Sequence, residues 1–195
     1  MFVVPIAMAQ VWLFSALALV FFGFLIRVMA RRQSEAGGRH ATSSRLGIIV
    51  QGLGMAFVVP GAIRPALAWS SLAAIAACLA ILLLMSGAIA LFASSSTALG
   101  KNWSFQARTR SDHELIRSGP YAYVRHPIYL GMLLFMLAWA VALGHWANLV
   151  VAMPLFVIGT KMRTAAEDRL LEASFGQDFI AYRKSVPALF PRLKH

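Results

Sequence analysis

Five apolar runs dominate this sequence, and their lengths restrict what the chain can fold into. A helix needs roughly 20 consecutive apolar residues to cross the hydrocarbon core of a bilayer. The runs are Gln10–Met29, Leu46–Ile63, Ala66–Ala93, Pro127–Leu143 and Trp146–Lys161. Hydrophobic residues make up 59% of the chain and charged residues only 13%, unlike a soluble domain. The sequence therefore predicts an all-α integral membrane bundle of five transmembrane helices.

The spans divide a single membrane domain, residues 1–195, into four parts. We predict three N-terminal spans in 1–93, a cytoplasmic loop in 94–126, a helical hairpin of spans four and five in 127–162, and a cytoplasmic cap in 163–195. Span five is expected to continue into the cap as a helix that stops at Gly176, because glycine is common just after helix ends. A short helix over Gln177–Ser185 follows.

The distribution of basic residues predicts the orientation. Loop one, loop three and the C-terminal tail hold seventeen of the eighteen Lys and Arg residues, while Arg64 lies in a loop on the other side. Since basic residues concentrate in cytoplasmic loops, we predict an external N-terminus and a cytoplasmic C-terminus, in the inner or plasma membrane if the source is bacterial. The net charge of +11 is then explained by anionic membrane lipids and requires no nucleic acid.

Several chemistries are disfavoured by the sequence. Residues 1–10 have neither a basic region nor a small-residue cleavage pattern, so we expect the first span to be retained. Cys78 is the only cysteine, which excludes an intrachain disulfide and a cysteine zinc site. His113 and His126 have no partner at metal-ligand spacing, and no metal is expected. We expect His40, His145 and His195 to have no functional role.

A polar group stands directly before the apolar run of span four. It consists of Arg125, His126, Pro127 and Tyr129. Proline is favourable at the first position of a helix, and the free N–H groups and positive dipole end there attract anions. Taken singly, these side chains fit an arginine, a histidine and a tyrosine at the membrane interface. Their combination favours a binding site.

A second polar group follows span five. Arg163, Glu167 and Leu171 are spaced to share one helix face, and Asp168 adjoins them. The group could be a solvated face beside the membrane. However, it contains two of only seven acidic residues, and acids do not help a basic protein to bind anionic lipid. We therefore hypothesise that it recognises a cation. The glycines Gly52, Gly54 and Gly159 are expected to serve helix packing.

Two motifs in the second half of the chain resemble a known family. They are the stretch Leu115–Gly131, which contains Gly119-Pro120-Tyr121 and Arg125-His126-Pro127-Ile128-Tyr129, and a C-terminal pattern of Arg163-Thr164, Glu167-Asp168, Phe175-Gly176, Tyr182-Arg183-Lys184 and Val186-Pro187. Both resemble the isoprenylcysteine carboxyl methyltransferase family and the related phospholipid methyltransferases. The resemblance covers about residues 100–191. It departs at Asp168, where the family often has a second glutamate.

The resemblance implies a membrane enzyme that uses S-adenosylmethionine, bound between the last two spans and the cap. By this resemblance, Arg163 and Glu167 are the catalytic candidates. The cofactor-binding candidates are Tyr123, Arg125, His126, Pro127, Tyr129, Glu167, Asp168 and Tyr182. Arg125 and His126 would suit the cofactor's carboxylate. Glu167 and Asp168 would suit its ammonium or ribose, with Arg163 and Tyr182 orienting them.

The expected reaction transfers a methyl group to a lipid-borne or apolar acceptor, with a carboxylate of an isoprenylcysteine-like substrate as the first choice. A carboxylate acceptor requires no base, whereas an amine requires Glu167 or His126 to accept a proton. The alternatives are a phospholipid N-methyltransferase, an NADPH-dependent membrane reductase, since sterol-reductase-like proteins have a similar Arg-His-Pro motif, and a non-enzymatic membrane scaffold. A lipid or prenylated small molecule and membrane lipids are the expected partners. The oligomeric state stays open.

The distribution of basic residues yields a testable topology. We expect a reporter fused after His195 to be cytoplasmic and one inserted at Gly144-His145 to be external, because the intervening segment contains one transmembrane helix. Activity of a paired alkaline phosphatase and green fluorescent protein reporter measures both locations. Detection of both sites on the same side of the membrane would contradict the five-span topology.

Overall fold

The computed structural model describes residues 4–30, 42–100 and 114–191. In these ranges the regular secondary structure is helical, apart from one isolated bridge between Ile6 and Pro65, and turns and irregular segments connect the helices. The α-helices are α1 (Met8–Ala30), α2 (Thr42–Ala56), α3 (Leu72–Leu99), α4 (Pro127–Leu143), α5 (Leu149–Phe175) and α6 (Gln177–Ser185). Two short 3-10 helices, η2 (Gly119–Ala122) and η3 (Trp146–Asn148), precede α4 and α5. The predicted all-α class is confirmed for the described residues.

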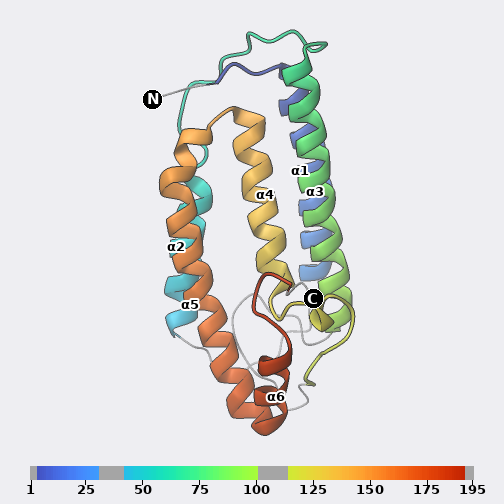
Figure 1. Cartoon of the computed structure of the whole chain (residues 1–195), viewed down its shortest axis with the longest axis vertical. Coiled ribbons are helices and arrows are strands. Elements are labelled where there is room, and N and C mark those ends of the chain that lie inside the picture. The colour runs from blue at the N-terminus through green and yellow to red at the C-terminus, as the bar shows by residue number, and fades with distance from the viewer. Residues whose placement is uncertain (1–3, 31–41, 101–113, 192–195) are drawn as a thin grey trace.

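The long helices run side by side in two groups (Figure 1). Helices α1, α3 and α4 share an aromatic core, in which the ring of Phe21 lies 5.2 Å from that of Phe92 and 5.1 Å from that of Phe135, measured between centroids. Helix α2 packs mainly against α5. Helix α6 lies below these groups, beside the lower end of α5.

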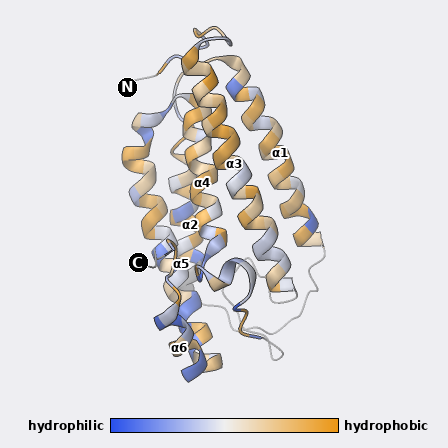
Figure 2. Ribbon diagram, turned by 45° about the vertical axis from the view of Figure 1, so that its right-hand side comes forward, coloured by the Kyte–Doolittle hydropathy of each residue, from blue (hydrophilic) through white to orange (hydrophobic). Residues whose placement is uncertain are grey.

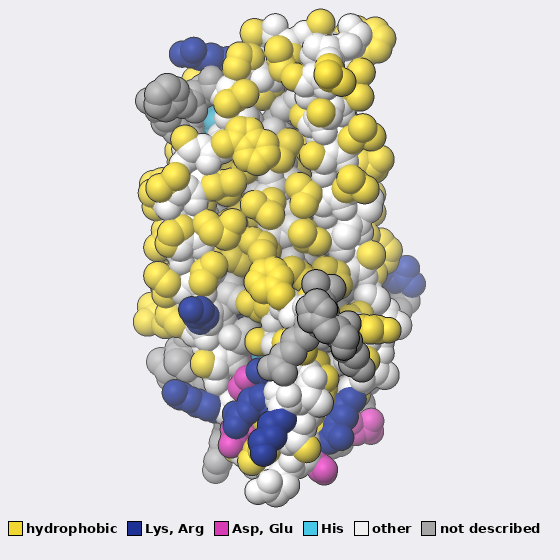
Figure 3. Space-filling view, viewed as in Figure 1, with side chains coloured by type: hydrophobic (Ala, Val, Ile, Leu, Met, Phe, Trp, Pro, Cys, Tyr) yellow, Lys and Arg dark blue, Asp and Glu magenta, His cyan; other side chains and the backbone are white. Residues whose placement is uncertain are grey.

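The surface has the polarity of a membrane protein. Figure 2 shows apolar residues along the length of the bundle and hydrophilic residues around α6. Figure 3 shows the same division on one face, with charged side chains gathered at the lower end. Helices α1 and α3, and η3 together with α5, are long and apolar enough to cross a membrane, while α2 and α4 are apolar but shorter. These features identify an integral membrane protein.

Two of the predicted spans have bounds that differ from those of the helices. Helix α2 ends at Ala56 and not at Ile63, because Pro60 disfavours a helical Val59. Helix α3 covers Leu72–Leu99 and not Ala66–Ala93. It begins where the Ser71 hydroxyl accepts a hydrogen bond from the Ala74 N–H.

Residues 94–99 of the predicted loop 94–126 belong to α3. The helix continues through Ser94, Ser96 and Thr97, whose hydroxyls donate to carbonyls three or four residues earlier, as Thr97 does to Ala93 at 2.7 Å. The loop is further structured by η2 at Gly119–Ala122. Its residues Trp103, Phe105 and His113, together with most of loop one, lie outside the described residues.

The helices predicted in the second half of the chain match the structure in most of their bounds. Helix α4 covers the predicted Pro127–Leu143, and α5 continues to Phe175. Gly176 then has a positive φ of 50°, a conformation that favours glycine. The predicted helix Gln177–Ser185 is α6, with Phe179 and Tyr182 buried. Residues 163–175, which we predicted to belong to the cap, form the last turns of α5.

At the end of the bundle opposite α6, buried polar side chains join the α4–α5 turn to the segment that follows α2. His145, for which we expected no functional role, is buried there. Its Nδ1 lies 3.1 Å from the carbonyl oxygen of Val58, and Asn148 donates to the carbonyl oxygen of Pro60 at 2.7 Å. These contacts pair the carbonyls freed where α2 ends. His145 is therefore a structural residue.

Helices α2 and α5 approach each other closely at glycines. A Cβ added to Gly54 would lie 2.6 Å from the Phe156 backbone nitrogen, and one added to Gly159 would lie 2.7 Å from the Gln51 Cα. Both distances are too short for any side chain. The predicted packing role is thus confirmed for Gly54 and Gly159, whereas Gly52 is exposed with nothing within 4 Å of an added Cβ.

This packing gives a matched pair of substitutions. We expect Gly159→Ala to lower the free energy of unfolding by about 1–3 kcal/mol, because the added methyl group overpacks a backbone contact. Gly52→Ala should leave the stability unchanged or raised, since alanine is the better helix former. Thermal unfolding in detergent measures both. Equal melting temperatures for the two variants would contradict the close α2–α5 contact.

Candidate functional site

The turn before α4 is held against the segment that follows α6. The Arg125 N–H donates to the carbonyl oxygen of Pro187 at 2.8 Å, and the His126 N–H donates to that of Ala188 at 2.9 Å. Pro127 is buried at the first position of α4, where its missing N–H costs no hydrogen bond. These two backbone hydrogen bonds thereby fix where the Arg125 and His126 side chains enter the site.

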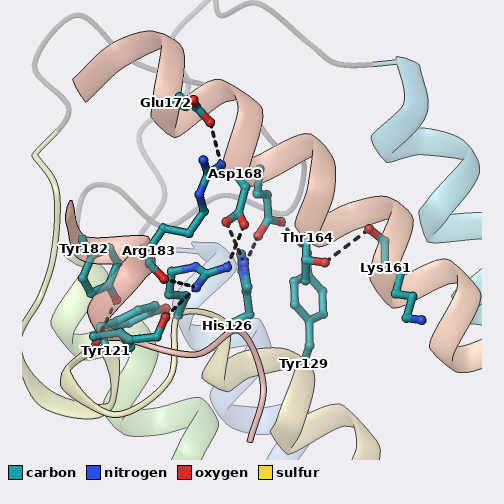
Figure 4. Close-up of polar contacts among 12 residues, drawn as sticks. Tyr121, His126, Tyr129, Lys161, Thr164, Asp168, Glu172, Tyr182 and Arg183 are labelled. Atoms are coloured by element: carbon teal, nitrogen blue, oxygen red, sulfur yellow. Dashed lines mark hydrogen bonds and ion pairs between the residues drawn. The ribbon is translucent and has the colours of Figure 1, made fainter. Parts of the chain in front are cut away.

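Asp168 pairs with both cationic side chains. The Arg125 Nη2 donates to Asp168 Oδ2 at 2.9 Å, and the His126 Nε2 lies 3.0 Å from Asp168 Oδ1. In Figure 4, the Asp168 side chain points from α5 toward His126. The contact therefore joins α5 to the start of α4 through both carboxylate oxygens.

Glu167 extends this ion pair toward the interior of the bundle. Its Oε2 lies 3.2 Å from the His126 Nδ1, and its Oε1 accepts a hydrogen bond from the Tyr129 hydroxyl. The guanidinium carbon of Arg163 lies 4.7 Å from the centre of the Tyr129 ring, a distance at which a cation is attracted to the ring face. Arg163, Glu167 and Asp168 thus line up along α5, from inside the bundle to its polar end.

The two carboxylates hold a proton on His126. Each ring nitrogen faces a carboxylate oxygen, and a neutral imidazole has only one N–H to donate. Burial opposes the charged form, but the hydrogen bonds and charges of Asp168 and Glu167 outweigh it and raise the pKa of His126 above its usual value. A histidine in this state is a poor general base. The arrangement instead favours a fixed imidazolium that orients both acids.

A second set of contacts attaches α6 and the segment after it to the residues that precede α4. The Arg125 Nη1 donates to the carbonyl oxygen of Val186 at 2.5 Å, and the Tyr182 hydroxyl donates to that of Tyr121 at 2.6 Å. Burial raises the pKa of Tyr182 to about 12, so its hydroxyl keeps this proton at neutral pH. Arg183 and Glu172 form a more exposed ion pair at 2.6 Å.

The structure brings most of the predicted site residues together. The ion-pair cluster, as we call it from here on, consists of Arg125, His126, Tyr129, Arg163, Glu167 and Asp168. Pro127 starts the helix beneath it. Tyr182 bonds to Tyr121 and not to the acids, contrary to the predicted orienting role. Tyr123 is 71% exposed and lies outside the cluster.

Two residues of the site were missed by the sequence analysis. Gln51 on α2 and Thr160 on α5 are buried, and Gln51 accepts a hydrogen bond from the Arg163 Nη1 at 2.7 Å. The signal that could have found Gln51 is its position, since an amide inside an apolar span needs a polar partner.

Comparison with known proteins agrees with the motifs. A profile described as phospholipid methyltransferase matches residues 73–178, which is more than half of the chain. The protein-S-isoprenylcysteine O-methyltransferase of Schizosaccharomyces pombe is 32% identical over 85 residues, which are 44% of this chain and 36% of that protein. The rat protein of the same name is 30% identical over 107 residues, 54% of this chain and 36% of that protein.

One relative carries a different name. The cobalt-zinc-cadmium resistance protein CzcN of Cupriavidus metallidurans is 32% identical over 100 residues, 51% of this chain and 46% of that protein. This chain thus spans between a third and a half of these curated relatives. A solved structure of the eukaryotic intramembrane Ras methyltransferase ICMT aligns over 77% of this chain and 64% of that one, with 21% identity and a TM-score of 0.47.

The raised pKa of His126 predicts a pH dependence of stability. Above about pH 6.5 the unfolded chain loses a proton that the folded protein keeps, so the melting temperature should fall as the pH rises toward the raised pKa. His126→Gln should be less stable at pH 6 and should lose most of this slope. Thermal unfolding in detergent between pH 6 and 9 measures both. Parallel curves for the two proteins would contradict the proposed charge.

Proposed function

Because the chain belongs to the phospholipid methyltransferase family, we propose that it is a membrane methyltransferase that uses S-adenosylmethionine to methylate a lipid-borne or apolar acceptor. The observation that carries this proposal is the ion-pair cluster. Its residues come from the two motifs of the second half of the chain and meet at the polar end of the bundle. That end is where a soluble methyl donor and a membrane acceptor can both arrive.

The cluster suits the charged groups of the donor. The side chains of Glu167 and Asp168 are 26% and 17% exposed, whereas those of Arg125 and His126 are 10% and 4% exposed. The acids are thus the more accessible members and can meet the donor's ammonium or ribose. The Arg125 Nε–H is buried and has no hydrogen-bond partner among the described residues. It is the donor group available to a carboxylate.

The chain's own residues supply position more than acid–base chemistry. S-adenosylmethionine supplies a methyl group that is activated by its sulfonium. His126 holds both acids in fixed directions, and Arg163 and Tyr129 close the cluster on its membrane side. Such preorganisation favours an in-line transfer in a site that excludes water. Arg163 and Glu167 are the residues that we place nearest the reacting groups.

The acceptor we favour is a carboxylate of an isoprenylcysteine-like molecule, because two relatives are named as isoprenylcysteine O-methyltransferases. The family description favours a phospholipid amine as the second candidate. An amine must lose a proton, and Glu167 is then the base, since His126 already holds a proton. Mass spectrometry of a lipid extract incubated with methyl-labelled S-adenosylmethionine distinguishes a methyl ester from a methylated amine.

For the membrane arrangement, we propose five spans with an external N-terminus and a cytoplasmic cap. The alternation of ends along the chain supports this count. The segment before α1, the α2–α3 connection and the α4–α5 turn meet at one end, where Val4 bonds to Gly144 and Ile6 to Arg64. The start of α4, the last turns of α5 and α6 lie at the other end, which we assign to the cytoplasm (Figure 1).

The donor site is tested by binding. We expect Glu167→Gln and Arg125→Ala each to weaken the affinity for S-adenosylhomocysteine at least tenfold, equivalent to about 1.4 kcal/mol. Glu172→Gln is the matched control, because Glu172 is on the same helix but pairs with Arg183 outside the cluster. It should bind as the wild type does. Calorimetry with folded, purified variants measures the three affinities. Unchanged binding in both cluster variants would place the pocket elsewhere.

A further inference from the structure

We infer that Gln51 is a positioning residue for Arg163 in the reaction. The inference rests on the proposed function, in which Arg163 stands next to the reacting groups. Gln51 lies on α2, outside the residues 73–178 that match the family profile. A helix that the family match does not include therefore reaches the ion-pair cluster.

The packing of α2 on α5 fixes where Gln51 lies. Gly47, Gln51 and Gly54 are spaced to share one face of α2. A Cβ added to Gly47 would lie 2.7 Å from the Arg163 Cγ, and one added to Gly159 would lie 2.7 Å from the Gln51 Cα. With no room for side chains at these glycines, the Gln51 backbone is held directly against the turn of α5 that leads to Arg163.

The partners of Gln51 allow its amide only one orientation. The Arg163 guanidinium donates hydrogen bonds and cannot accept them, so the Gln51 Oε1 must face it, at 2.7 Å from Nη1. The Gln51 Nε2 is thereby directed to the Thr160 Oγ1, which accepts its hydrogen bond at 2.8 Å. All three residues are buried. A flipped amide would leave buried polar groups unpaired, which is costly.

The contact restrains a long, flexible side chain. Arg163 has its guanidinium against the Tyr129 ring on one side and bonded to Gln51 through Nη1. Tyr129 in turn donates to Glu167. Gln51 thus acts on the cluster through Arg163 and touches none of the acids in the described contacts. Its removal would let the guanidinium move relative to Tyr129 while leaving the Asp168 pairs intact.

The position of Arg163 indicates which step depends on it. It lies one helical turn from Glu167 toward the bundle interior, whereas Asp168 and Arg125 lie toward the cap. The residues that we assign to the donor are therefore on the aqueous side, and Arg163 is on the side from which a membrane acceptor comes. Loss of Gln51 should lower kcat and leave the affinity for S-adenosylhomocysteine unchanged.

The test compares two buried glutamines. Gln51→Leu removes the Gln51 Oε1 that accepts a hydrogen bond from Arg163, and Thr160→Val removes only the group that orients the amide. Gln51→Glu is the conservative variant, because it keeps an oxygen facing the guanidinium. Gln10→Leu is the matched control, since Gln10 is also buried in a membrane helix but donates to the carbonyl oxygen of Val141 at the opposite end. Each full-length variant is assayed in detergent for folding, S-adenosylhomocysteine affinity and methyl-transfer rate.

We expect Gln51→Leu to lower kcat at least tenfold, Thr160→Val to lower it about threefold, and both to bind S-adenosylhomocysteine within about threefold of the wild type. Gln51→Glu should recover most of the rate, and Gln10→Leu should lower the melting temperature without changing kcat.

Equal kcat in Gln51→Leu and Gln10→Leu overturns the inference. If Gln51→Leu does not fold, an unchanged kcat in Thr160→Val overturns it alone. A wild type without methyl transfer or donor binding contradicts the proposed function itself.

Discussion

The pairing of Asp168 with Arg125 and His126 is the contact on which the polar end of this protein depends. Charged groups near a membrane interior are stable only when they are paired. Asp168 satisfies two cations from one side chain, and Arg125 uses its other nitrogen for the carbonyl of Val186. The start of α4, the last turns of α5 and the segment after α6 are thereby joined at one point.

From that contact, polar groups continue into the bundle in a definite order. His126 pairs with both Asp168 and Glu167. Glu167 accepts a hydrogen bond from the Tyr129 hydroxyl, and the Arg163 guanidinium lies against the Tyr129 ring. Charges of opposite sign alternate along most of this path, so each member has a neighbour that stabilises it. In the proposed function, this arrangement separates two tasks. The end near α6 offers accessible acids to the charged donor, and the inner end offers Arg163 to the membrane acceptor.

The sequence predicted those parts of the fold and site that depend on local signals. Pro127 marked the start of α4, Gly176 marked the end of α5, and the spacing of Arg163 and Glu167 placed both on one helix face. It did not predict which charges would pair. The site was read as an anion site at Arg125 beside a separate cation site at Glu167, but the fold brings the two groups into one cluster. Only tertiary structure determines that distance.

The roles of the glycines on α2 also depend on tertiary structure. Spacing along α2 cannot say which of its glycines faces α5, and the structure selects Gly47 and Gly54 over Gly52. That selection has a consequence for the site, because the same face carries Gln51, whose amide meets Arg163. Close packing in a membrane is stabilised by van der Waals contact and a few buried hydrogen bonds. Here, the face that packs α2 on α5 also positions a side chain of the site, so a change in helix packing reaches Arg163 without altering any residue that contacts it.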